Sequence, residues 1–239
     1  MPTRRSLQEY QRAQQRLLAR AERELARFAD RLDWSDLVRA REQFKAFLPE
    51  LAAVYGEATA TVAAEWYDEL RSEAGARGPF SAVLADIPGP EVIHPGLVWA
   101  MQPGFDSGDI GAARDRIGRV TARHIRNAGR NTIAASAELD PAGPRWARVP
   151  TRMDPCAFCV MLASRGPVYW TQETAELSAA GRTYHSDCGC DPVPVWEGDP
   201  LPDGYDPDAL YQIYQDARAV AGGDTRAILA EMRLQQGIH

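Results

Sequence analysis

The spacing of apolar residues at the start of the chain constrains its fold more than any other feature. From Leu7 to Leu32 apolar side chains recur every three or four residues, and Arg, Glu and Gln fill most of the other positions. This period is typical of an α-helix with one apolar stripe. The same pattern predicts a second helix that ends near Phe47, before Pro49, and a third over residues 50–73. Each of these stripes needs a partner that buries it.

The next part of the chain combines an irregular connection with another long helix. Residues 75–109 are rich in Pro and Gly, which predicts a long connection with a short helix in its middle. Ser107 or Asp109 can cap a helix that runs through residues 110–139, and His124 lies within its apolar stripe. A histidine in such a stripe is most simply a helix residue satisfied by a neighbour. Residues 1–140 are therefore predicted to form a helical region for assembly or docking.

The sequence changes character after residue 140. The segments RWARVP, PVYW and PVPVWE are typical of short strands, and TQETAELSAA is typical of a short helix between them. Two helical segments follow, ALYQIYQDARAV and DTRAILAEMRLQQ, the second with Asp224 as its cap. The predicted fold class is therefore mostly α, with a small α+β C-terminal domain over residues 141–239.

All four cysteines lie in this C-terminal region, in a C-x-x-C and a C-x-C motif. Thiolates and imidazoles are the ligands that Zn²⁺ prefers in structural sites, where it binds four of them in a tetrahedron. The candidate ligands number five for four positions: Cys156, Cys159, His185, Cys188 and Cys190. The sequence thus predicts a structural zinc site. Because a C-x-C replaces the usual second C-x-x-C, buried free thiols and disulfides remain alternatives.

The expected compartment favours the metal. The N-terminal segment is charged throughout and lacks the apolar core of a secretory signal, and no stretch is long and apolar enough for a membrane span. We therefore expect synthesis in a reducing cytoplasm and no membrane partner. In that setting paired cysteines are more often metal ligands or catalytic groups than structural disulfides.

A catalytic interpretation of the same residues is also open. Cys156 or Cys159 could act as a nucleophile with His185 as its base, oriented by Asp154 or Asp187. The chain contains no phosphate-binding loop, dinucleotide fingerprint, H-E-x-x-H or G-x-S-x-G motif. Phosphoryl transfer, dinucleotide chemistry and zincin proteolysis therefore lack their usual residues.

Charge gives a third interpretation. The 239 residues are 45% hydrophobic and 25% charged, an ordinary globular composition, and the net charge of −6 argues against a surface that binds nucleic acid throughout. One region is nevertheless basic, through Arg114, Arg116, Arg119, Arg123, Arg126, Arg130, Arg145 and Arg148. This region could be a solvated helix face, or it could contact DNA or an acidic protein surface.

A longer stretch of sequence resembles a known family. The residues GRNTIAASAELDPAGPRWARVPTRMDPCAFCVMLASRGPVYW, then YHSDCGCDPVPVW and GYDPDALYQIYQDAR, resemble the C-terminal half of minor capsid proteins from tailed phages of actinobacteria. Those proteins belong with the phage Mu F-like head morphogenesis proteins and often carry the name capsid maturation protease. The resemblance covers residues 129–218.

The resemblance implies a fold and a function. It implies a helical N-terminal part followed by a compact unit whose motif falls on the five candidate ligands. The strand that leads into this motif falls on Arg145, Trp146, Arg148, Val149 and Pro150. It also implies a virion protein present in few copies near the portal, needed for head morphogenesis or for DNA packaging and delivery. Portal protein, major capsid protein, packaged DNA and further copies of the chain are the expected partners.

Overall fold

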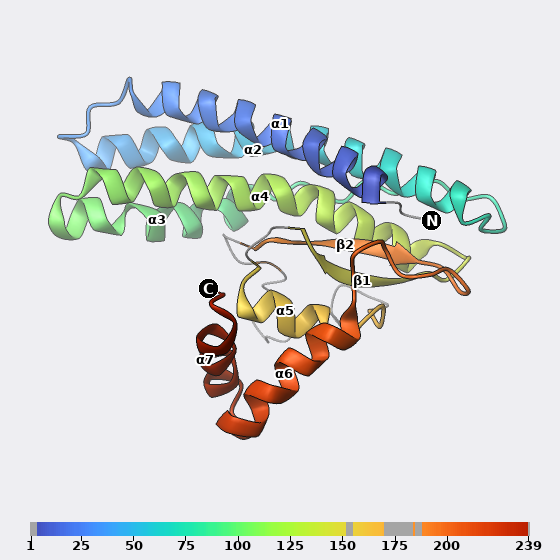
Figure 1. The fold of residues 1–239 in the computed structure, drawn as a ribbon. Helices are drawn as coiled ribbons and strands as arrows, with labels where there is room; N and C mark the ends of the chain where they lie inside the picture. Colours follow the sequence, from blue (N-terminus) through green and yellow to red (C-terminus); the bar gives the residue numbers. More distant parts are fainter. Residues whose placement is uncertain (1–3, 152–154, 170–183, 185–187, 239) are drawn as a thin grey trace. The chain divides into compact units, whose positions relative to one another are not determined.

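The computed structural model describes residues 4–151, 155–169, 184 and 188–238, which are mostly helical (Figure 1). In chain order the elements are α1 (Arg4–Ala29), α2 (Leu37–Glu73), α3 (Pro90–Ser107), α4 (Ile110–Leu139), β1 (Arg145–Pro150), α5 (Ala157–Ala163), β2 (Cys190–Val195), α6 (Pro207–Ala221) and α7 (Thr225–Gln236). The two strands form one small sheet in the C-terminal part. The predicted fold class is therefore confirmed.

The chain forms two compact units. The bundle unit comprises Gln8–Glu65 and Leu84–Thr132, and the cysteine unit comprises Met1–Leu7, Trp66–Val83 and Ile133–His239. Helices α1, α2 and α4 contribute residues to both units. The division into residues 1–140 and 141–239 remains a sequence-based prediction.

In the bundle unit, α1 to α4 lie side by side (Figure 1). Phe28 of α1 stacks on Phe47 of α2 with 3.9 Å between ring centroids, and meets Phe44 edge-on at 5.3 Å. The buried core around these rings comprises Leu25, Ala29, Ala40, Phe44, Leu48, Leu51, Ala52, Ile93, Leu97, Ala100, Met101, Ile117 and Val120. The stripes expected from the sequence thus bury one another within this unit.

The predicted helix break at Pro49 is wrong, because α2 runs through it. A proline inside a helix leaves the carbonyl four residues earlier without its N–H partner. Here that carbonyl belongs to Lys45, and it accepts a hydrogen bond from Nε2 of His94 in α3 at 3.0 Å. Leu48 and Leu51 are buried on either side of the proline, so continuing the helix also keeps the core intact.

The predicted irregular connection is also partly wrong, because 18 of its residues form α3. Its buried residues are Ile93, Leu97, Ala100, Met101 and Gly104, whose spacing of three or four gives the helix a packing face. Pro and Gly suggested a loop, but Pro90 occupies the first turn, where its missing N–H costs nothing. The predicted cap at Asp109 is confirmed, because its Oδ1 accepts the Ala112 N–H at 2.9 Å.

The sheet of the cysteine unit is an antiparallel pair. Its register runs from Arg145 opposite Val195 to Pro150 opposite Cys190. The strands predicted from RWARVP and PVPVWE are therefore confirmed in type. Of the third, PVYW, the described residues 167–169 form one bridge, between Tyr169 and Trp146. The helix predicted from TQETAELSAA lies outside the described residues.

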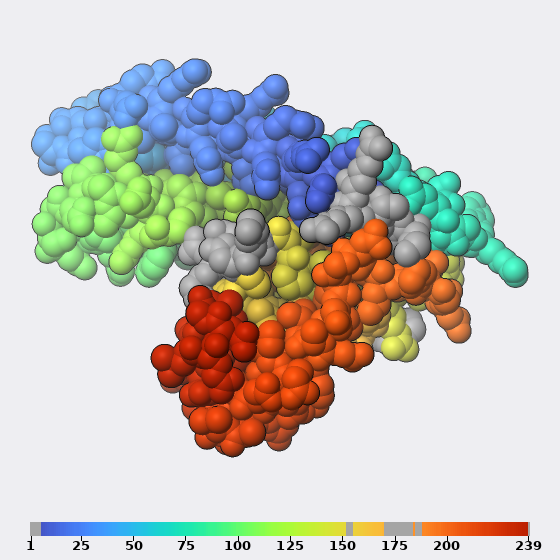
Figure 2. Space-filling view, viewed as in Figure 1, coloured from blue at the N-terminus to red at the C-terminus, as the bar shows by residue number. Residues whose placement is uncertain are grey.

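Three helices complete the cysteine unit. Val160 and Leu162 of α5 share an apolar core with Ala217 of α6 and Ile228 and Met232 of α7. Figure 2 shows α6 and α7 packed side by side at the surface. Asp224 caps α7 by accepting the Ala227 N–H at 2.8 Å, as the sequence predicts. Among the helices that the structure describes, none has the length and apolar character required to cross a membrane.

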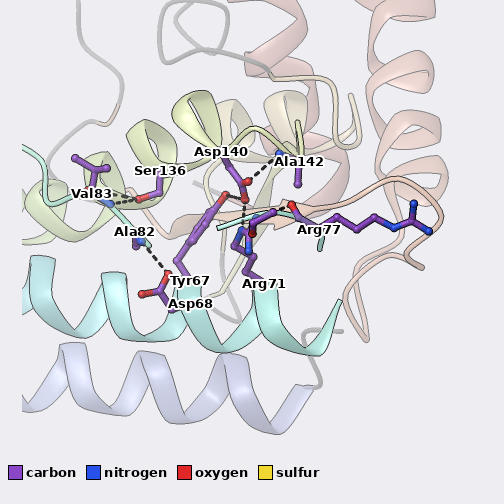
Figure 3. A network of polar contacts seen from close by, with 10 residues as sticks. Tyr67, Asp68, Arg71, Arg77, Ala82, Val83, Ser136, Asp140 and Ala142 are labelled. Atoms are coloured by element: carbon purple, nitrogen blue, oxygen red, sulfur yellow. Dashed lines mark hydrogen bonds and ion pairs between the residues drawn. The ribbon is translucent and has the colours of Figure 1, made fainter. Parts of the chain in front are cut away.

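A buried polar network ties the end of α2 to the end of α4 within the cysteine unit (Figure 3). One carboxylate oxygen of Asp140 accepts hydrogen bonds from Nε of Arg71 at 2.9 Å and from the Tyr67 hydroxyl at 3.1 Å. The other accepts the Ala142 N–H at 2.9 Å. Burial, and then the negative charge of Asp140, raise the pKa of Tyr67. The network fixes the turn that leads into β1.

Candidate metal centre

The C-x-x-C motif forms the start of α5. Cys156 is the residue before the helix, in an extended conformation, and its Sγ accepts the Cys159 N–H at 3.3 Å. The other end of α5 is held by two tyrosines. Tyr169 donates its hydroxyl to the Leu162 carbonyl at 2.9 Å, and Tyr205 donates to that of Ala163. Both ends of this short helix are therefore fixed.

The C-x-C motif leads into β2. Between its two cysteines, the Gly189 carbonyl accepts hydrogen bonds from the N–H and the hydroxyl of Thr151, at 2.8 and 3.2 Å. The Thr151 hydroxyl also contacts a carboxylate oxygen of Asp191 at 3.0 Å. Because Pro150 pairs with Cys190, the end of β1 sets the position of the motif.

These two motifs bring the four sulfur atoms together. The Sγ–Sγ distances are 3.1 Å from Cys156 to Cys159, 3.4 Å from Cys159 to Cys188 and 3.3 Å from Cys188 to Cys190. All four side chains are buried. The sulfurs of Cys159, Cys188 and Cys190 all lie within 4.8 Å of one another, which is close enough to share one metal ion.

The distances separate a thiol cluster from disulfides. A disulfide requires an S–S separation of about 2.05 Å, and none of the four cysteines forms a disulfide within the described residues. A zinc ion bound to thiolates at about 2.3 Å places neighbouring sulfurs about 3.8 Å apart at the corners of a tetrahedron. The observed contacts of 3.1 to 3.4 Å are nearer to the second value. The sulfurs of Cys159, Cys188 and Cys190 therefore have a spacing at which they could share one ion, and the Cys156 sulfur lies beside them.

A buried arginine lies against this cluster. Arg148 is 1% exposed and donates from Nε to the Cys190 sulfur at 3.4 Å and from Nη2 to the Cys188 sulfur at 3.6 Å. Its guanidinium carbon lies 4.1 Å from the centre of the Tyr184 ring. Nη1 is buried and has no hydrogen-bond partner among the described residues. In this part of the chain no carboxylate forms an ion pair with Arg148.

The electrostatics match this geometry. Burial by itself lowers the pKa of Arg148, but Tyr184, Cys190 and Cys188 outweigh it, so the net shift is upward and the side chain is a cation. Hydrogen bonds with Cys156, Cys188 and Cys190, together with burial, raise the pKa of Cys159. The hydrogen bond with Cys159 lowers the pKa of Cys190. The hydrogen bond with Cys188 and burial act in the opposite direction and outweigh it, so the net effect raises the pKa of Cys190 to about 12. A divalent metal supplies the positive charge that favours thiolates over thiols.

The structure brings together most of the predicted ligands. Cys159, Cys188 and Cys190 form the compact set, and Cys156 joins it through its contact with Cys159. The fifth candidate, His185, lies outside the described residues, as do Asp154 and Asp187 of the catalytic interpretation.

Arg148 needs a correction. From the sequence it belongs to a basic surface region, whereas the structure buries it against two sulfurs. Arg148 lies two residues after Trp146, and in a strand two residues at this spacing point to the same face. Because Trp146 is fully buried, this spacing could have predicted that Arg148 is buried too. Arg130 is likewise buried, and Arg116 lies over the Trp99 ring at 4.8 Å. The basic region is therefore not one continuous exposed face.

Fold and site together define a helical protein with a small cysteine-rich unit built around a buried thiol cluster. The family model of the VG15 protein matches residues 1–217, so the chain belongs to the VG15 family. It is 29% identical to the Gene 15 protein of Mycobacterium phage D29, in a match that covers 48% of this chain and 54% of that protein. The chain thus spans about half the length of this relative. No solved structure matches. The chain is a phage protein.

Proposed function

We propose that this VG15 chain is a minor capsid protein of a tailed phage, of the Mu F-like kind, which acts in head morphogenesis and in DNA packaging or delivery. The observation that carries the proposal is the family match over residues 1–217, together with a phage relative. The residues 129–218 that resemble minor capsid proteins include the thiol cluster and the strand before it. In this proposal the chain resides in the phage head.

The site supports a structural role for the cysteines. Cys159 and Cys190 are 0% exposed, and Cys156 is 6% exposed. A nucleophile that attacks a polypeptide must reach the substrate carbonyl, whereas a structural zinc site is closed. The proposal therefore assigns the cluster to a structural zinc ion that holds α5 to the sheet, with ligands drawn from the five predicted residues. This favours an assembly protein over the cysteine-protease alternative.

Portal protein and major capsid protein are the proposed partners, and packaged DNA is a further contact. On α4, Arg119 is exposed and Arg123 and Arg126 are partly exposed, so these three side chains can reach DNA. If they bind phosphates, affinity should fall steeply with salt and charge reversal at these three positions should remove it. DNA binding that survives both changes would exclude these three arginines as the phosphate contacts.

Mass spectrometry of purified particles tests the virion role. We expect the chain in particles at a small fraction of the copy number of the major capsid protein. Particles from a phage that lacks the gene should show defective heads or impaired DNA delivery, and wild-type protein supplied in trans should restore them. Absence of the chain from particles, combined with normal heads without the gene, would refute the proposal.

A separate experiment addresses proteolysis. Cys156→Ser and Cys159→Ser variants are co-expressed with the capsid proteins, and cleavage is followed by intact-mass measurement. The assembly role predicts no cleavage that depends on either thiol. Cleavage that the wild type performs and folded variants lose would favour the protease instead.

A further inference from the structure

The buried positive charge of Arg148 needs a negative charge close to it, and a cluster of neutral thiols does not provide one. A buried guanidinium loses its hydration and must be compensated by charge or by strong hydrogen bonds. Two of its nitrogens donate to the sulfurs of Cys188 and Cys190, and Nη1 is left without a partner among the described residues. Neutral thiols are weak acceptors, whereas thiolates are strong ones. The donor arrangement therefore matches a cluster in its charged state.

A thiolate cluster in turn needs positive charge. Four thiolates around one divalent ion carry a net charge of about −2, which is costly to bury without a nearby cation. Arg148 places one positive charge beside two of the sulfurs. The N–H of Cys159 adds a third donor, directed at the Cys156 sulfur at 3.3 Å. These three donors point at the sulfurs of Cys156, Cys188 and Cys190. The Cys159 sulfur contacts the sulfurs of Cys156 and Cys188.

We propose that Cys156, Cys159, Cys188 and Cys190 bind one zinc ion as a four-thiolate centre and that Arg148 is its built-in counter-cation. The proposal rests on the structural zinc of the proposed function and narrows it in two ways. It selects the four thiolates from the five predicted ligands, leaving out His185. It also gives Arg148 a positioning role, in which its hydrogen bonds fix the C-x-C sulfurs and offset their charge.

The choice of four thiolates follows from the sulfur contacts. The four sulfurs form an unbroken series of contacts between 3.1 and 3.4 Å, and all share one buried cluster with Tyr184. The Cys156 sulfur joins this series through the Cys159 sulfur and lies outside the set of three sulfurs that are all within 4.8 Å of one another, so it would have to move furthest to bind the same ion.

The first test measures zinc affinity of the purified full chain by competition with a chromophoric chelator. Arg148→Met removes the charge and the N–H donors but keeps an unbranched apolar side chain as long as the stem of the arginine. We expect it to weaken zinc binding roughly 10- to 100-fold, as loss of an outer-shell partner does. Arg148→Lys keeps the charge but loses the forked set of N–H donors. Its zinc affinity should therefore lie between those of the wild type and Arg148→Met. Arg145→Met is the matched control, on the same strand but exposed, and should bind like the wild type.

The second test identifies the ligands. Cobalt replaces zinc, and its visible spectrum reports the number of thiolates through the sulfur-to-metal charge-transfer intensity and the position of the d–d bands. Substituting any one of the four cysteines by Ser should reduce the charge-transfer intensity by about a quarter or abolish binding. His185→Ala should leave the spectrum and the zinc affinity unchanged. If Arg148→Met does not fold, the affinity and cobalt spectrum of Arg148→Lys carry the test.

The outcomes separate this inference from the proposed function. Wild-type protein that carries no zinc after purification under reducing conditions, and takes up none, overturns both the metal and the four-thiolate centre. Zinc that is lost in His185→Ala, or that binds Arg148→Met as tightly as Arg145→Met, overturns the inference alone. The virion role is decided independently by the particle experiments.

Discussion

Replacing Asp140 by Ala should be among the most damaging single changes in the cysteine unit. The Asp140 side chain is fully buried and accepts hydrogen bonds from Arg71, Tyr67 and the Ala142 N–H. The substitution removes all three and leaves the Arg71 guanidinium, whose side chain is 10% exposed, without its carboxylate. An unpaired buried charge is the main source of the expected loss.

The structure also limits the size of the effect. Breaking a buried ion pair typically costs 3–5 kcal/mol, about the cost of leaving one charge uncompensated. Nη2 of Arg71 keeps its hydrogen bonds to the carbonyls of Arg77 and Gly78, both at 3.0 Å, so compensation is partial. We therefore expect a loss near the lower end, about 3 kcal/mol. Asp140→Asn also removes the negative charge but retains an acceptor for the Arg71 Nε–H, so it should cost somewhat less, about 2–3 kcal/mol.

Urea unfolding with saturating zinc, followed by circular dichroism, measures these changes, and a double-mutant cycle isolates the ion pair. Arg71→Met removes the charge that Asp140 compensates. Asp140→Ala should therefore cost about 2 kcal/mol less in the Arg71→Met background than in the wild type. Tyr67→Phe, which removes one hydrogen bond to the carboxylate but leaves the ion pair, serves as the control at about 1.5–2 kcal/mol. Equal costs of Asp140→Ala in the two backgrounds would refute the electrostatic reasoning.

Three further predictions follow from other parts of the structure. Burial lowers the pKa of His124 to about 4, so the unfolded chain binds a proton that the folded chain does not. Stability should fall by up to about 3 kcal/mol as pH drops from about 6.5 to 4, and His124→Gln should flatten this part of the pH profile in urea titrations. In α4, a Cβ at Gly129 would lie 2.9 Å from Nε2 of Gln14 and 3.0 Å from the Thr59 carbonyl, so Gly129→Ala should cost about 1–3 kcal/mol. Gly118→Ala in the same helix meets no atom within 4 Å and should stabilise by about 0.5–1 kcal/mol; similar thermal shifts for both variants would contradict this packing. Finally, if zinc holds the cysteine unit together, a strong chelator should lower its unfolding temperature and re-addition of zinc should restore it, while an unchanged transition would exclude a stabilising metal.

Most of the helices could be predicted from the sequence because their apolar residues repeat with the helical period. The stripe from Leu7 to Leu32 corresponds to α1, and Asp109 and Asp224 cap the helices expected of them. The two errors both involve proline. Pro49 lies inside α2, Pro90 begins α3, and Pro95 and Pro103 lie inside α3. A local rule treats proline as a break, because it does not include a distant partner for the freed carbonyl, such as His94 for Lys45.

The candidate site, too, could be predicted from the sequence only in part. The spacing of the two cysteine motifs was enough to predict a shared site, because C-x-x-C and C-x-C each place two thiols close together. Spacing alone left Arg148 among the surface arginines. Its charge is a property of the residue, but its burial depends on the pairing of β1 with β2 and on α5 packing beside them. Only that arrangement shows that the cation contacts sulfur rather than solvent.

By itself, the sequence determined the helical class, the two cysteine motifs and the resemblance to phage head proteins. These are features of neighbouring residues, and they follow from periodicity, spacing and residue type. The tertiary structure decided which side chain donates to the carbonyl that Pro49 leaves unpaired, which acid neutralises Arg71 and which groups Arg148 contacts. Each of these pairs joins residues that are tens of positions apart, and their free energies depend on burial and on the distances that packing sets.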